Sequence, residues 1–113
     1  MSRKNALLSA IPFPVEQSLR RLGTSLKTAR LRRNLTLESV AEKIGTNRRV
    51  ISDAENGKPT TGLAIYAALL WTYGLLSQLD DVASPERDRE GQTLANLRER
   101  TRARSGGGLD DDF

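Results

Sequence analysis

A helix-capping residue followed by a glycine about ten residues later occurs twice in succession in this chain. Thr36 can accept hydrogen bonds from the free amides at a helix start, and Gly45 can adopt the left-handed conformation that ends a helix. Asn47 and Gly57 bracket the next segment in the same way. The apolar stripes of the two segments are Val40, Ala41 and Ile44 in the first, and Ile51 and Ala54 in the second. The pattern predicts two helices of about two turns each, joined by a tight turn.

Longer helical patterns flank this pair. Apolar residues recur at helical spacing from Val15, and this helix is expected to end near Asn34. Thr61 can cap a further helix from Gly62 to about Tyr73, and a fifth amphipathic helix is expected before residue 84. The supporting residues are Val15, Leu19, Leu22, Leu26 and Ala29 in the first of these helices, and Leu75, Leu76, Leu79 and Val82 in the last. The expected fold class is all-α, with five helices in one domain over residues 14–84.

Both ends of the chain are expected to lie outside this domain. Residues 1–13 are predicted to form an extended, flexible arm, because Pro12 and Pro14 each disfavour helix at the preceding residue. Residues 85–113 are predicted to form a charged, flexible tail. Within it, residues 86–104 are expected to form at most a frayed helix, since Gly91 weakens a helix. The arginines of this segment also alternate in a way that suits no single helical face: Arg98, Arg100, Arg102 and Arg104.

Composition excludes several classes of function. The 113 residues include no cysteine and no histidine, which removes disulfides, thiolate metal sites and the commonest general base. We therefore expect neither an enzyme nor a bound cofactor or metal. The net charge of +4 favours attraction to polyanions such as nucleic acid. No apolar run approaches the roughly 20 residues that a membrane span needs, and the N-terminal patch lacks a signal-peptide core, so a cytoplasmic protein is expected.

Residues 35–58 resemble the Cro/C1 (XRE) family of helix-turn-helix phage repressors. The resemblance rests on features at fixed offsets, namely Ala41, Gly45, Asn47 and the closing run Glu55, Asn56, Gly57 and Lys58. It implies a lambda-repressor-like domain in which the second helix of the pair is a recognition helix that lies in the major groove of DNA. The implied function is that of a sequence-specific transcriptional repressor in a bacterial cytoplasm, associated with the nucleoid when bound to its operator.

The same resemblance implies a role for individual residues. The base-reading positions are Arg48, Arg49, Ser52 and Asp53, and the phosphate-contacting positions are Thr36, Asn47, Lys58, Thr60 and Thr61. Asp53 either accepts from cytosine N4 or holds Arg49 four residues earlier, and we favour the second because an acid near phosphates is repelled. Leu37 stands where the family commonly has a glutamine that touches the DNA backbone, so this contact is not expected. A structural ion pair is implied between Arg30 and Glu55.

A homodimer on a palindromic operator is the expected assembly, because two-fold proteins read two-fold sites and one short helix reads only a few base pairs. The region after the helix pair also holds more apolar surface than a small helical domain needs for itself. We place the dimer contact on Leu69, Leu70, Trp71, Leu75, Leu76 and Leu79.

A second, looser resemblance concerns the flanking segments. Residues 11–16, 64–70 and 83–88 are similar to those of HipB-like regulators encoded beside HipA-type kinase toxins. This similarity implies an antitoxin that represses its own operon and binds the kinase, with residues 86–104 as a candidate contact segment. Whether a further operon-encoded protein completes the system stays open. A stand-alone repressor and a protein-interaction module that uses the fold without DNA are the alternatives.

Overall fold

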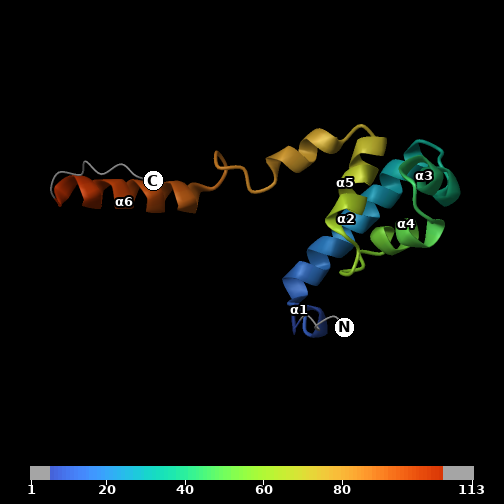
Figure 1. Ribbon diagram of the computed structural model, residues 1–113, viewed down its shortest axis with the longest axis horizontal. Coiled ribbons are helices and arrows are strands. Elements are labelled where there is room, and N and C mark those ends of the chain that lie inside the picture. Colours follow the sequence, from blue (N-terminus) through green and yellow to red (C-terminus); the bar gives the residue numbers. More distant parts are fainter. Residues whose placement is uncertain (1–5, 106–113) are drawn as a thin grey trace. The chain divides into compact units, whose positions relative to one another are not determined.

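The computed structural model describes residues 6–105, and this part of the chain contains helices and no strands (Figure 1). The chain divides into two compact units, one up to Leu79 and one from Asp80 onward. The first unit contains α1 (Ala6–Ser9), α2 (Phe13–Arg32), α3 (Leu37–Ile44), α4 (Arg48–Glu55) and α5 (Leu63–Thr72). A 3-10 helix, η1 (Leu76–Asp81), crosses the division, and α6 (Arg89–Arg104) belongs to the second unit. The prediction of an all-α fold is confirmed.

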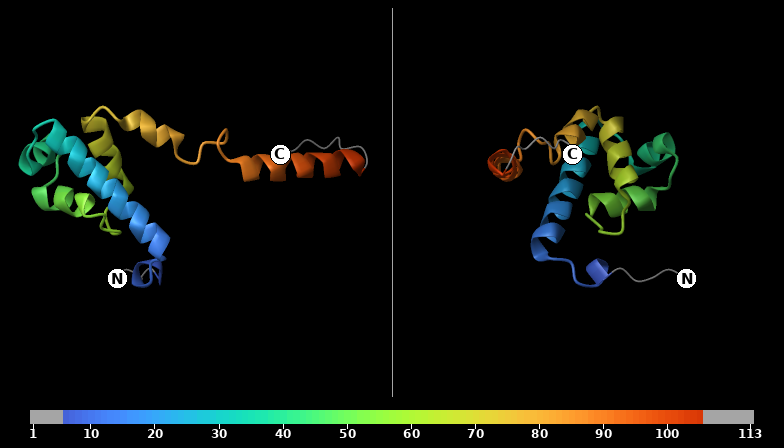
Figure 2. Two further views of the ribbon diagram at one scale, coloured as in Figure 1. Left: turned by 180° about the vertical axis from the view of Figure 1, so that it is seen from behind. Right: turned by 60° about the vertical axis from the view of Figure 1, so that its left-hand side comes forward.

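The core of the first unit is built by four helices. Leu26, Val40, Ile51 and Leu69 are its largest fully buried side chains, so α2, α3, α4 and α5 contribute one each. The α3 helix packs on both α4 and α5, while α2 packs on α4. Figures 1 and 2 show α3 and α4 gathered on the same side of the long α2 helix. This packing fixes α4 from two directions, because α2 and α3 both contact it.

The predicted caps of α3 and α4 are present in the structure. The Thr36 hydroxyl accepts from the Ser39 amide at 3.0 Å, and the Ser39 hydroxyl accepts from the Thr36 amide at 3.1 Å. Gly45 ends α3 in the left-handed conformation, with φ of 83°. The Asn47 side-chain oxygen then accepts from the Val50 amide at 3.1 Å. The two helices are thus begun and ended by local chemistry, as their sequence predicts.

Two glycines allow α2 and the end of α4 to approach each other closely. A Cβ atom at Gly23 would lie 2.5 Å from the backbone oxygen of Glu55. A Cβ atom at Gly57, whose φ is +70°, would lie 2.7 Å from the backbone oxygen of Leu19. Both distances are shorter than real Cβ contacts, so a larger residue at either position would force the backbones apart.

Some element boundaries differ from the prediction. The α2 helix begins at Phe13, with Pro12 as its N-cap, and the four-residue α1 lies within the segment that was expected to be extended. Val15 is 44% exposed, so the core stripe of α2 does not extend to its start. Gly62, rather than Thr61, caps α5, and this cap has no side-chain hydrogen bond.

The region after α5 also differs from the prediction. The expected fifth α-helix is the short 3-10 helix η1, which lies between Gly74 and Ala83, two residues with left-handed φ values of 75° and 57°. The predicted flexible tail contains the 16-residue helix α6. Gly91 is tolerated there because it lies in the first turn, where its amide donates to the Asp88 side chain at 2.9 Å. Residues 1–5 of the predicted arm and 106–113 of the predicted tail lie outside the described residues.

Candidate nucleic-acid interface

Arg48 and Arg49 form the first turn of α4, and both are exposed. Within residues 6–105, neither side chain forms an ion pair or a hydrogen bond. The first turn of α4 contains no acid, whereas the first turn of α3 contains Glu38. Two cations therefore stand at the positive end of a helix dipole, an arrangement that is mildly unfavourable unless an external anion is bound.

Thr36 and Asn47 lie beside these arginines at the starts of α3 and α4. A shallow hollow brings the two cap residues together with Arg48. Each cap uses only an acceptor, so the Thr36 hydroxyl hydrogen and the Asn47 amide hydrogens are left to donate to an anion. Glu38 and Glu42 line the same hollow. Because these carboxylates repel phosphate, we expect an anion to bind near Arg48 rather than near Glu38 and Glu42.

Asp53 is paired with Lys58 rather than with Arg49, so the favoured interpretation of Asp53 is wrong. The Lys58 ammonium lies 3.7 Å from the Asp53 carboxylate, and both side chains are partly exposed. The Lys58 amide also donates to the Asp53 backbone oxygen at 3.0 Å, which folds the chain back toward the end of α4. Thr60 is exposed in the loop that follows, where the Thr61 amide donates to the Lys58 oxygen at 3.0 Å. Ser52, on the preceding turn of α4, is half-buried.

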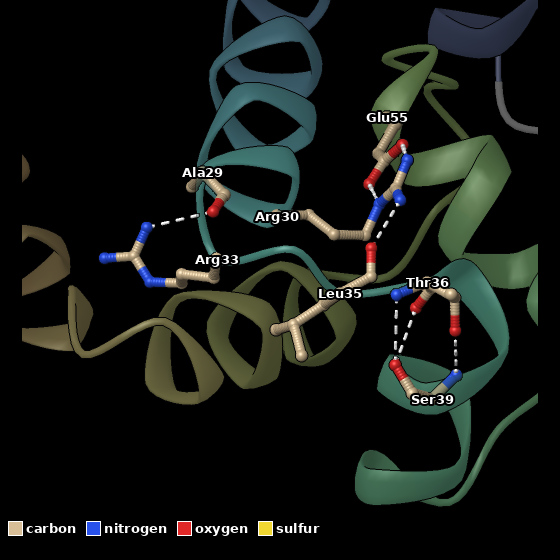
Figure 3. Close-up of polar contacts among 7 residues, drawn as sticks. All are labelled: Ala29, Arg30, Arg33, Leu35, Thr36, Ser39 and Glu55. Atoms are coloured by element: carbon tan, nitrogen blue, oxygen red, sulfur yellow. Dashed lines mark hydrogen bonds and ion pairs between the residues drawn. The ribbon is translucent and has the colours of Figure 1, made fainter.

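Arg30 and Glu55 form the ion pair that the resemblance implied, and Figure 3 shows both of its contacts. The Arg30 Nε donates to Glu55 Oε2 at 2.7 Å, and Nη2 donates to Oε1 at 3.0 Å. A third nitrogen, Nη1, donates to the Leu35 backbone oxygen at 2.9 Å. Arg30 and Glu55 are only 7% and 8% exposed. The hydrogen bond to Glu55 raises the pKa of Arg30 above its ordinary value, against the opposing effect of burial. One guanidinium thus joins α2, α4 and the segment leading into α3.

Arg33 and Tyr73 make a second set of contacts that sequence reasoning missed. The Arg33 guanidinium donates to the backbone oxygens of Ala29 and Tyr73, both at 2.9 Å. It also lies 5.6 Å from the centre of the Tyr73 ring. Burial raises the pKa of Tyr73 to about 12. These contacts tie the end of α5 to the end of α2, and the only signal in the sequence was the position of Arg33 next to the helix end.

The residues expected at a dimer contact differ in how far they are exposed. Leu69 and Leu70 are 0% and 8% exposed within the domain itself, so they belong to its own core and cannot contact a partner. Trp71 and Leu76 are 57% and 38% exposed. Leu75 and Leu79 are half-buried against the core. The Lys43 ammonium of α3 lies over the Trp71 ring, 5.5 Å from the centre of the ring.

Comparison with known families identifies the class of this domain. Residues 26–70, which run from α2 to α5, match the family model described as helix-turn-helix. The match covers less than half of the chain, and it describes this segment as a helix-turn-helix. Its two central helices are α3 and α4, and the exposed arginines lie at the start of the second. No curated protein and no solved structure matches this chain. No helix within residues 6–105 is both long enough and apolar enough to cross a membrane.

Proposed function

We propose that this protein is a sequence-specific transcriptional repressor that reads operator DNA with the first turn of α4. The observation that carries the proposal is the pair of exposed cations, Arg48 and Arg49, which have no partner within residues 6–105 and lie at the positive end of this helix. An arginine in this position can donate two hydrogen bonds to guanine O6 and N7 in the major groove. Thr36 and Asn47 line the same hollow as Arg48 and offer donors for backbone phosphates, and the Lys58 ammonium, beyond the other end of α4, offers a further cation.

Selection of binding sites from a random duplex library tests this proposal directly. The wild-type chain should enrich a motif that contains guanine, and Arg48→Ala or Arg49→Ala should relax the preference at one position of that motif. Arg21→Ala is the matched control, because Arg21 is an exposed arginine of α2 outside the helix pair. Failure of the wild-type chain to enrich any motif would leave a protein-interaction module as the better description.

The repressor acts as a homodimer on an inverted repeat in this proposal. Trp71 and Leu76 supply the exposed apolar surface for the contact, flanked by Leu75 and Leu79. Sedimentation velocity at micromolar concentration should give a dimer mass, and Trp71→Ser should shift the equilibrium toward monomer. Leu63→Ser is the control, since Leu63 is 69% exposed at the other end of α5. A wild-type monomer with and without DNA would contradict the dimer.

An antitoxin role is the finer proposal, and it rests on the resemblance of the flanking segments to HipB-like regulators. The partner would be a HipA-type kinase toxin, and the kinase contacts would lie outside α4, because one face cannot hold operator and toxin together. Co-expression with the product of the adjacent gene, followed by affinity purification, is the test. If no complex forms and the neighbouring product is harmless alone, the protein is a stand-alone repressor in the same cytoplasmic setting.

A further inference from the structure

The second unit of the chain carries a helix with uncompensated cations. Arg98, Arg100 and Arg104 lie in the second half of α6, and all three are exposed. Their side chains form no ion pair or hydrogen bond with any residue in the described range, 6–105. Arginine is the only cation of α6, which contains no lysine. This cluster is not part of the helix-turn-helix match, which ends at residue 70.

The spacing of these arginines opposes helix stability rather than supporting it. Arg98 and Arg102 are four residues apart, as are Arg100 and Arg104, and like charges at this spacing repel each other. The one acid among them, Glu99, lies four residues from Ala95 and from Ala103. It therefore cannot neutralise Arg98, Arg100 or Arg104 along the helix. Glu99 can reach only Arg102, three residues on, so the Arg100–Arg104 repulsion is not offset within α6, and a bound polyanion would relieve it.

The two arginine pairs lie on different flanks of α6. Residues two apart are separated by roughly 200° around a helix axis. The row formed by Arg98 and Arg102 therefore lies on one flank of α6, and the row formed by Arg100 and Arg104 lies on the other flank. The side between the two rows carries Leu94, Leu97 and Thr101 at helical spacing, and Leu94 and Leu97 are 54% and 47% exposed. Glu99 lies on the opposite side of the helix from Leu94 and Leu97, so it would point away from a ligand that contacts both arginine rows.

A groove between two phosphate strands fits this arrangement. The major groove of DNA is about 12 Å wide and admits one helix, with a phosphate backbone on each side. Arginine also binds phosphate through two parallel hydrogen bonds, which lysine cannot do. We propose that α6 is a second DNA-binding element of this protein, one that holds backbone phosphates through its arginine rows without sequence preference.

This inference rests on the proposed function, since it extends DNA binding to the second unit. The test uses the full chain, a random-sequence duplex of about 30 base pairs, and binding constants measured across a salt series. The variant Arg98→Gln, Arg100→Gln, Arg104→Gln should reduce the slope of log K against log salt by about 2 to 3, because each phosphate neutralised by an arginine adds about 0.9 to the slope. Its affinity at 0.1 M salt should fall roughly fivefold to tenfold for each phosphate that is no longer neutralised.

The matched control is the triple change to lysine at the same positions, which keeps the charge and should keep most of the salt slope. Glutamine and lysine are both good helix formers, and circular dichroism checks that α6 remains helical in each variant. A glutamine variant with the wild-type slope and affinity would overturn the inference.

The failure of this inference is distinguishable from the failure of the proposed function. If Arg48→Ala abolishes sequence preference while the α6 variant behaves like the wild type at every salt concentration, the repressor proposal stands and the α6 proposal falls. If the wild-type chain shows no sequence preference but its salt slope depends on the α6 arginines, the reverse holds.

Discussion

The two ends of α4 carry charge in opposite ways. At its C-terminal end, Glu55 is 8% exposed and is held by two hydrogen bonds from Arg30. At its N-terminal end, Arg48 and Arg49 are exposed and have no partner within residues 6–105. The buried end fixes where the helix lies, and the exposed end is left to meet an anion from outside. The buried charge of Glu55 therefore holds α4 in place within the fold, while the exposed charges of Arg48 and Arg49 are available to bind an external anion.

Breaking the buried end should have the largest effect on folding. Glu55→Ala leaves the Arg30 guanidinium buried without its carboxylate, and removing one partner of a buried pair typically costs about 3 to 5 kcal/mol of unfolding free energy. Urea denaturation measures the change. The control is Asp53→Ala, which removes the partly exposed pair with Lys58 and should cost about 0 to 1 kcal/mol. Equal costs for the two variants would contradict the assignment of Glu55 to positioning.

The close approach of α2 to the same end of α4 should also be essential for the fold. Gly23→Ala should destabilise the domain by about 1 to 3 kcal/mol, because the new Cβ meets backbone atoms of Ala54 and Glu55 that cannot move aside. The better helix propensity of alanine does not offset this clash. Gly62→Ala is the control, since nothing lies within 4 Å of a Cβ built there and its φ is −70°, so only the smaller cost of a poorer N-cap for α5 is expected. A neutral Gly23→Ala would mean that the two helices do not approach as closely as described.

The start of α4 allows its cap and its anion contact to be separated. Asn47→Ala should cost about 1 kcal/mol of stability by removing the side-chain acceptor for the Val50 amide. Asn47→Asp keeps an equally good cap, so its stability should match the wild type. The added negative charge should nevertheless weaken DNA binding, which fluorescence anisotropy with a labelled duplex would detect. Unchanged binding by Asn47→Asp would place DNA elsewhere on the domain.

Sequence reasoning predicted the features that depend on near neighbours. Thr36, Gly45 and Asn47 act within three or four residues of chain, and each performs its predicted part in starting or ending a helix. The Arg30–Glu55 pair spans 25 residues, and it was expected only because of a family resemblance. The base-reading and phosphate roles of the exposed residues remain predictions.

The features that were missed depend on packing between distant segments. Leu69 and Leu70 were assigned to a dimer contact because the region after the helix pair holds more apolar surface than a small domain needs, yet α3 and α4 of the same chain pack on α5. Asp53 was paired with Arg49, but the turn at Gly57 brings Lys58 back toward its carboxylate. The α6 helix was undervalued because Gly91 was weighed as an interior residue, whereas it lies in the first turn.

The exposed end of α4 should have the smallest effect on folding and the most direct effect on function. The double variant Arg48→Ala, Arg49→Ala should change the unfolding free energy by less than about 0.5 kcal/mol, because exposed residues without partners contribute little to stability. Removing each arginine should cost about 1 to 3 kcal/mol of discrimination between the selected operator and a duplex with its guanine replaced. The decisive measurement is this discrimination, taken beside urea denaturation of the same sample. A variant that unfolds like the wild type but no longer distinguishes the two duplexes is the predicted result. A variant that keeps full discrimination, or that loses it only because it unfolds, would contradict the account.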